Sequence, residues 1–189
     1  MFAVPLVLFV ALAATFVLVL RRAARVMAGT RELDAFRRST ADLAARIDVS
    51  LTGVAGRIDG VRRHQLDPDA IAENLDAAED AIARYLEEAE AMRPPADVAG
   101  LRVTLAEELA RTARALDMVR HGCDALATGV AGPRELEGQT AVKRGYLNVL
   151  HARDAIRRVA ADAQRARLPR RSGRVVPTSG RIDEPHHNA

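Results

Sequence analysis

An apolar run near the amino terminus constrains this chain more than any other feature. Residues 2–20 carry no charged side chain. As an α-helix they would extend roughly 28 Å at about 1.5 Å per residue, close to the ~30 Å hydrocarbon core of a bilayer. Pro5 falls in the first turn, where its missing N–H group removes no helical hydrogen bond. The run therefore predicts a transmembrane helix, with the lipid bilayer as the partner of residues 2–20.

A cleaved signal peptide and a buried core helix are the two alternatives for this run. A signal peptide has a basic segment, then a shorter apolar segment of about 7–15 residues and a cleavage site between small residues. Here no basic side chain precedes the run, which is longer and ends in Arg21 and Arg22. A core helix is rarely apolar on every face over such a length. We therefore expect an uncleaved, single-pass anchor in the cell membrane.

The orientation of this anchor follows from the basic residues around it. None precedes it, whereas Arg21, Arg22, Arg25 and Arg31 follow it closely. Because basic residues favour the cytoplasmic side, the bulk of the chain is expected in the cytoplasm. The single cysteine, Cys123, is compatible with a reducing compartment. The opposite orientation stays open, because the very short segment before the anchor costs little to place on either side.

Beyond residue 20, apolar residues recur at intervals of three and four, the spacing of one helix face. A first stripe covers 33–61, and Gly29 either separates it from the anchor or lies inside one long helix. A second helix is expected to begin at Asp67 and Pro68, which suit a helix cap and a first turn. The two prolines at 94–95 are expected to end it.

Two further stripes cover 98–126 and 133–168, and no stretch alternates as a strand would. Short linkers favour antiparallel neighbours. The predicted fold class is all-α: an N-terminal transmembrane helix, then an antiparallel, coiled-coil-like bundle of about four helices, and a disordered tail. The predicted domains are 1–28 for the anchor, 30–168 for the bundle and 169–189 for the basic tail, which lacks periodicity and is rich in Pro and Gly.

Charge is distributed unevenly among the predicted helices. Residues 21–66 hold ten basic and five acidic side chains, net +5, whereas 67–95 hold two and nine, net −7. Residues 133–168 are net +4. We expect the acidic second helix to lie beside the basic first one. A docking face for a basic partner and a merely solvated face are the alternatives.

The same up-and-down topology predicts a membrane-surface contact. If the first helix leaves the membrane, the fourth returns toward it and brings the basic tail near the basic residues after the anchor. Each basic residue at an anionic surface contributes about 1 kcal/mol to binding. The predicted collar on anionic lipid consists of Arg21, Arg22, Arg25, Arg170, Arg171 and Arg174. A tail that only aids solubility is the alternative.

No pattern for catalytic, cofactor-binding or metal-binding residues is found in the sequence. No histidine has the spacing of a helical metal site, and His186 and His187 form only a pair. Cys123 lies on an apolar stripe and is predicted to be a buried, structural thiol. Dispersed basic charge and few aromatic residues argue against nucleic acid as a partner. We therefore expect a protein that is not an enzyme and uses no cofactor. Three glycines are interpreted as packing residues: Gly53, Gly56 and Gly60.

Two functions fit these expectations. The first is a membrane-anchored interaction or scaffold protein that binds an unknown protein partner or itself through its helix faces. The second is a ligand-sensing bundle with a small-molecule site between helices, which needs convergent polar groups in the core. The candidates for such a site are Thr40, Thr112, Thr140 and Tyr146. An interior pocket with Thr112 and Tyr146 converging would favour the sensor, and a filled core the scaffold. The Arg- and Ala-rich composition, with Lys143 as the only lysine, is typical of a GC-rich bacterial genome.

Overall fold

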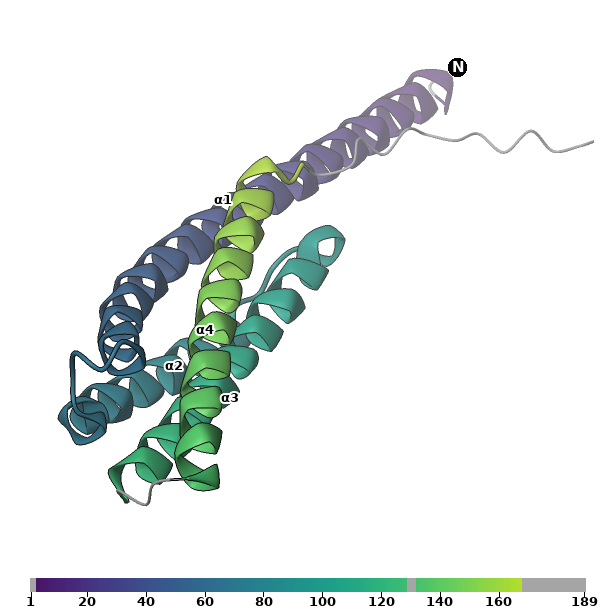
Figure 1. The fold of residues 1–189 in the computed structure, drawn as a ribbon. Helices are drawn as coiled ribbons and strands as arrows, with labels where there is room; N and C mark the ends of the chain where they lie inside the picture. Colours follow the sequence, from purple (N-terminus) through teal and green to yellow (C-terminus); the bar gives the residue numbers. More distant parts are fainter. Residues whose placement is uncertain (1–2, 129–131, 168–189) are drawn as a thin grey trace, which may run out of the picture.

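The computed structural model describes residues 3–128 and 132–167, and it leaves out the side chains of residues 3–11, 13, 22, 25 and 26 (Figure 1). The described ranges are helical throughout, apart from turns and short connections, and contain no strand. The predicted all-helical class is therefore confirmed. The elements are α1 (Ala3–Arg62), η1 (Pro68–Ile71), α2 (Ala72–Ala91), η2 (Ala96–Val98), α3 (Ala99–Ala127) and α4 (Pro133–Arg165).

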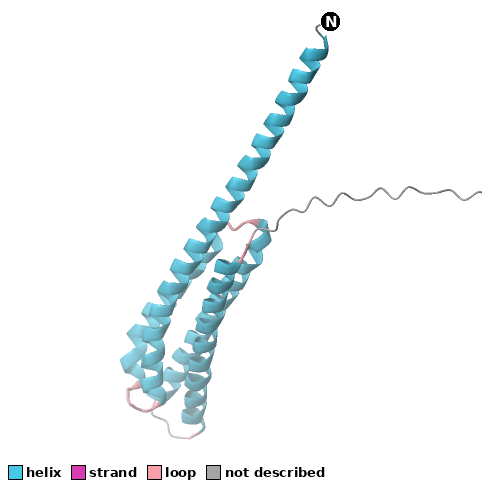
Figure 2. Ribbon diagram, turned by 90° about the horizontal axis from the view of Figure 1, so that it is seen from above, coloured by secondary structure: helices cyan, strands magenta, loops and turns pink. Residues whose placement is uncertain are grey.

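The four long helices form an antiparallel bundle, in which α1 packs on α2 and α4, and α3 packs on α2 and α4 (Figure 2). The antiparallel direction is visible in the contacts of α3 with α4. Gly122 lies against Gly138, and Gly145 lies against Ala115, so rising numbers on one helix meet falling numbers on the other. The predicted bundle is confirmed, with helix ends close to those expected from the prolines.

The helix ends are set by local chemistry. Helix α1 ends at Arg62, and His64 then adopts a positive φ of 56°. The chain turns back so closely that the N–H groups of Gln65 and Leu66 both donate to the carbonyl of Gly60. The predicted start at Asp67 and Pro68 is confirmed, because Asp67 occupies the cap position and Pro68 opens the first turn; that turn is a 3-10 turn, and the Asp67 side chain makes no capping hydrogen bond.

The core is aliphatic, as the stripes predicted. Its largest fully buried side chains come from all four helices and include Leu43, Ile47, Leu51, Ile58, Leu75, Ile82, Leu105, Leu109, Leu116 and Ile156. A second, smaller cluster closes the end of the bundle where α4 finishes. It consists of Leu33, Phe36, Val98 and Ala163, with Met92, Leu101 and Ala166 packed against it.

Three glycines bring α3 and α4 into close contact. A Cβ atom on Gly145 would lie 2.5 Å from Val119 Cγ2 and 2.9 Å from the carbonyl oxygen of Ala115. A Cβ atom on Gly122 would lie 2.9 Å from the carbonyl oxygen of Gly138, and the reverse contact is also 2.9 Å. Side chains at these positions would collide with backbone, so glycine is required for this approach.

The glycines chosen from sequence are mostly different ones. Gly53 and Gly56 have no atom within 4 Å of a Cβ placed on them, so their interpretation as packing residues is wrong. Gly60 alone is in close contact, with Leu66 Cδ1 2.7 Å from its Cβ position.

Helix α1 is much longer than its neighbours and extends beyond the bundle (Figures 1 and 2). It passes Gly29 without a break, so anchor and first stripe share one continuous helix, the second of the two alternatives considered. Leu33 is the first buried residue among its described side chains, and α4 ends beside Arg37. The bundle therefore occupies only the second half of α1.

Within the part of the chain that the structure describes, no helix is long and apolar enough to cross a membrane. The predicted transmembrane helix is thus not supported by the structure and stays a prediction. Residue 2 and the side chains of 3–11 and 13, all part of the predicted anchor, lie outside the described residues, as does the predicted disordered tail at 169–189.

Candidate functional site

One charged contact joins the acidic helix α2 to the basic helix α1. Arg46 Nη2 lies 2.5 Å from Glu88 Oε1, and its guanidinium stands 5.4 Å from the centre of the Tyr85 ring. The Tyr85 hydroxyl lies 3.1 Å from Ser50 Oγ. The hydrogen bond with Glu88 is the largest cause of a raised pKa at Arg46. The predicted complementarity between these helices is present at this point.

A second and denser contact joins α2 to α3 instead. Arg120 donates to both carboxylate oxygens of Glu79, at 3.1 and 2.9 Å, and its Nη2 lies 2.5 Å from Asp76 Oδ1. These hydrogen bonds raise the pKa of Arg120, with Glu79 the larger cause. Sequence reasoning missed this pairing, because the third helix has almost no net charge and so gave no sign of a charged contact with the acidic helix.

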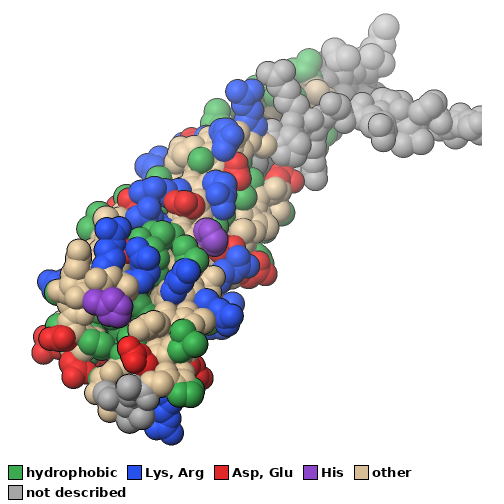
Figure 3. All heavy atoms as spheres, in the orientation of Figure 1, with side chains coloured by type: hydrophobic (Ala, Val, Ile, Leu, Met, Phe, Trp, Pro, Cys, Tyr) green, Lys and Arg blue, Asp and Glu red, His purple; other side chains and the backbone are tan. Residues whose placement is uncertain are grey.

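The ion pairs between the two basic helices, among the described residues, share one acidic residue. Asp48 of α1 lies 2.7 Å from Arg157 Nη2 and 3.8 Å from Arg153 Nε of α4. Arg153 also donates to Thr52 Oγ1 at 3.3 Å. Basic side chains are spread along this face of the molecule (Figure 3). Asp48 therefore allows two positively charged helices to lie side by side.

Part of the acidic face of α2 has no basic partner in the described part of the chain. Glu73, Asp80, Glu87 and Glu90 are exposed and make no ion pair there. The steps between them are seven, seven and three residues, which places all four on one face of the helix. Arg84 lies on the same face, between Asp80 and Glu87. This outward face remains available for a basic partner.

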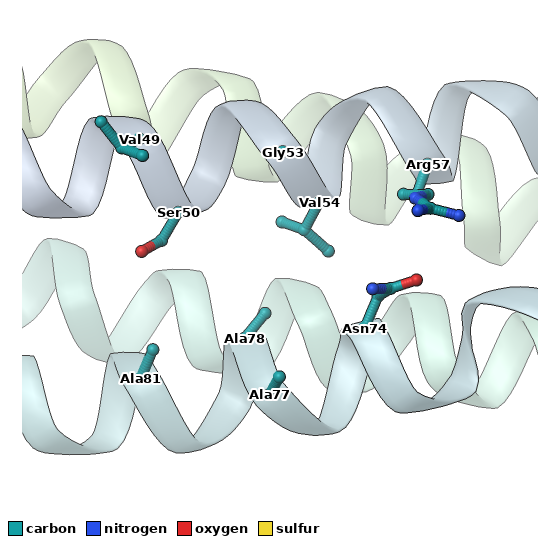
Figure 4. Close-up of a pocket in the computed structure, with 9 residues that line it drawn as sticks. All are labelled: Val49, Ser50, Gly53, Val54, Arg57, Asn74, Ala77, Ala78 and Ala81. Atoms are coloured by element: carbon teal, nitrogen blue, oxygen red, sulfur yellow. The ribbon is translucent and has the colours of Figure 1, made fainter.

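A groove runs between α1 and α2, the less closely packed side of the bundle (Figure 4). Its volume is about 360 Å³. Most side chains on both walls are small, so a space remains between the two helices beside Gly53. Val49, at its rim, is 75% exposed. The lining residues are Val49, Ser50, Gly53, Val54 and Arg57 from α1, and Asn74, Ala77, Ala78 and Ala81 from α2.

A second groove, of about 490 Å³, lies between α3 and the start of α4. It includes Met118, His121 and the 66% exposed Leu136. Thr140 also lines it, but its hydroxyl donates to the carbonyl of Leu136 one turn earlier in its own helix.

The four polar residues considered for a ligand site do not converge. The Thr112 hydroxyl is fully buried and donates to the Glu108 carbonyl of its own helix at 2.8 Å. The Tyr146 ring lies under Arg62, 5.4 Å from its guanidinium carbon. Thr40 is buried, and its hydroxyl is 3.9 Å from Met92 Sδ. Neither Thr112 nor Tyr146 lines either groove.

Two further interior groups matter for chemistry. Cys123 is buried, and desolvation raises the pKa of its thiol to about 11, which agrees with the predicted structural role. Glu108 was missed from the sequence. Its side chain is buried on α3, with Oε1 3.4 Å from Arg111 Nη1 and Oε2 without a hydrogen-bond partner. Its position three residues after Leu105 and four before Thr112, both on the third stripe, was the available signal.

No group of three potential metal ligands occurs among the described residues. His121 and His151 are exposed on their helices, and His186 and His187 lie outside the described range.

The predicted lipid collar is only partly described. Arg21 is exposed, whereas the side chains of Arg22 and Arg25 and all of Arg170, Arg171 and Arg174 lie outside the described residues. Gln164 of α4 donates to the carbonyl of Arg37 at 3.1 Å. Arg37 follows Arg21 by sixteen residues, or roughly 24 Å of helix. The described end of α4 therefore does not reach Arg21, and only the tail could span that distance.

Comparisons with protein-family models, with curated proteins and with solved structures found no match for this chain.

Proposed function

We propose that this protein is a single-pass, membrane-anchored interaction module, in which the apolar segment 2–20 inserts into the cell membrane and the bundle presents a helix face to a protein partner. The observation that carries the proposal is the contrast within α1. Leu12, Phe16 and Leu18 are 69, 60 and 63% exposed, whereas the apolar stripe from residue 33 onward is buried. Exposed apolar surface costs about 25 cal/mol per Å², so these side chains favour lipid over water.

The continuous helix sets the distance between the bilayer and the bundle. Residues 21–32 separate the apolar segment from the first buried side chain, Leu33. This spacer would hold the bundle roughly 20 Å from the membrane surface at about 1.5 Å per residue. Arg21, Arg22 and Arg25 would lie at the headgroups, where anionic lipid attracts them and favours a cytoplasmic bundle.

The open side of the bundle supports interaction rather than ligand sensing. The α1–α2 groove is open to solvent, combines small apolar side chains with Ser50, Arg57 and Asn74, and borders the helix that carries the unpaired acidic residues. An amphipathic helix with a narrow apolar face and basic flanks, from a partner or a second copy, would suit this surface. The hydroxyl groups of Thr112 and Thr140 are hydrogen-bonded to carbonyls of their own helices, and Thr40 and Tyr146 lie apart from them. We therefore prefer the interaction module to the ligand sensor.

Membrane fractionation combined with thiol labelling tests the anchor and its orientation. The variant Cys123→Ala, Ala189→Cys is expressed in its host, and cells are treated with a membrane-impermeant thiol reagent before and after lysis. We expect the protein in the membrane fraction, labelled only after lysis. Recovery in the soluble fraction would contradict the anchor, and labelling in intact cells would contradict the orientation.

A further inference from the structure

The carboxyl-terminal end of α2 is strongly negative and partly unpaired. Glu87 and Glu90 are exposed and make no ion pair within the described residues, whereas Glu88 is held by Arg46. The helix ends one residue later, at Ala91, without a basic residue in its own last turn, and Arg102 of α3 donates to the carbonyl of Glu90 at 3.1 Å. A helix carboxyl terminus carries a partial negative charge, which adds to that of the carboxylates. We call Glu87, Glu90 and this terminus the acidic end of α2.

The chain leaves the described structure at the same end of the bundle. Ala166, the residue after α4, packs on the cluster that also includes Met92, the residue after α2. Arg37 Nη2 donates to the carbonyl of Ala166, which fixes where the following chain begins. The next residues are strongly basic, with Arg170, Arg171 and Arg174 within eight positions of Ala166.

The distances are short enough for these two parts to meet. Arg174 can extend up to roughly 26 Å from Ala166, at about 3.3 Å per residue. Glu87 lies about 8 Å of helix before Met92. The tail is thus long enough to cross the end of the bundle and reach the outward face of α2.

We propose that the basic tail of this chain docks on the acidic end of α2 in the same molecule. Its arginines supply the positive charges that the carboxylates of Glu87 and Glu90 lack among the described residues, whereas the terminal carbonyl of Glu90 is already held by Arg102. Because the contact consists of exposed ion pairs, it is reversible and is screened by salt. A docked tail covers the face offered to a basic partner in the proposed function, and so competes with that partner.

Paramagnetic relaxation measures this contact directly. A nitroxide is attached to a cysteine at position 172 in the variant Cys123→Ala, Ser172→Cys, with the full chain in phosphatidylcholine nanodiscs. This lipid is zwitterionic, so no anionic surface competes for the arginines. We expect loss of amide signal intensity for residues 84–91 of α2, but not for the exposed α3 residues Val103, Thr104 and Glu107 at the same end of the bundle.

Matched charge variants separate docking from simple proximity. Glu87→Gln with Glu90→Gln should restore the signals of residues 84–91, as should 1 M salt. Glu107→Gln, an exposed and unpaired carboxylate of α3 among the described residues, should leave them broadened. Equal broadening of both faces, or broadening unaffected by the α2 variants, would overturn the proposal. A protein that fails to insert can be measured in buffer alone, so failure of the anchor is distinguishable from failure of this contact.

Discussion

The two sides of the bundle use glycine in opposite ways. On the α3–α4 side, Gly122, Gly138 and Gly145 face the partner helix and allow backbone contact, so the two helices are closely packed there, with a groove on the outer side of the start of α4. On the α1–α2 side, Gly53 points into an open groove and touches nothing. Gly138 and Gly145 are seven residues apart, two helical turns, and so share one face. The comparison teaches that the neighbour of a glycine, not its presence, decides whether it brings two helices together.

The largest expected effect comes from a pair of glycine substitutions that should have opposite signs. Gly145→Ala places a Cβ atom against Val119 and the Ala115 carbonyl, and should lower the free energy of unfolding by about 1–3 kcal/mol. Gly53→Ala meets nothing and removes flexibility from the unfolded chain, so it should raise that free energy by about 0.5–1 kcal/mol. Urea unfolding followed by circular dichroism measures both, and equal effects would refute the comparison.

The ion pairs that α2 makes with α3 and with α1 should differ less in their contribution to stability than the two glycines do. Arg120→Ala removes a partner shared by Glu79 and Asp76 and should cost about 1 kcal/mol of stability. Arg46→Ala breaks a more exposed pair on the open side and should cost about 0.5 kcal/mol. Thermal unfolding of the two variants ranks them, and a larger loss for Arg46→Ala would contradict the assignment of the open side.

The stability of the protein at alkaline pH tests whether the Cys123 thiol, next to Gly122, is shielded from solvent. The buried Cys123 has a pKa raised to about 11 from an ordinary value of 9.0. Between these values the unfolded chain loses a proton that the folded chain keeps, so stability is full below pH 9 and falls toward pH 11. Cys123→Ala should remove this part of the pH dependence. An unchanged profile in the variant would show that the thiol is accessible in the folded protein.

The smallest effect on stability is expected at the rim of the open groove. Val49 is 75% exposed, so Val49→Asp should change the free energy of unfolding by less than about 0.5 kcal/mol. The same variant should nevertheless weaken association, because a charge would enter the apolar part of the groove. Sedimentation of the full chain and chemical cross-linking in membranes measure how strongly copies of the chain associate. An exposed control on α3, Val103→Asp, should leave it unchanged.

The sequence predicted the helices well because the signals for their ends are local. The prolines at 94–95 and Pro133 stop or start a helix whatever lies around them, and apolar spacing marks the buried face. By contrast, the role of a glycine or a charge depends on a neighbour distant in sequence. Gly53 and Gly145 could not be distinguished without knowing which helix faces them. The pairing of Arg120 with Glu79 required the register between α2 and α3.

The candidate surfaces were predictable only in part. The acidic second helix was evident from composition, but not which of its carboxylates would remain unpaired. Glu88 and Glu90 are two residues apart, and only Glu88 turns toward Arg46. The groove beside Val49 forms where small side chains of α1 lie opposite small side chains of α2, and no single stretch of sequence reveals that pairing.

Carbonate extraction of membranes tests the central claim, that the amino-terminal part of α1 anchors the protein. The full chain is compared with Phe16→Asp, Leu18→Asp and with a control, Val103→Asp, which places a charge on another exposed apolar site, within the bundle. Charges in a bilayer core cost about 2.5–3.5 kcal/mol each, so the double variant should lose its hold on the membrane. We predict that the full chain and the control resist extraction, and that the double variant is released. Release of the full chain, or retention of all three proteins, would contradict the account.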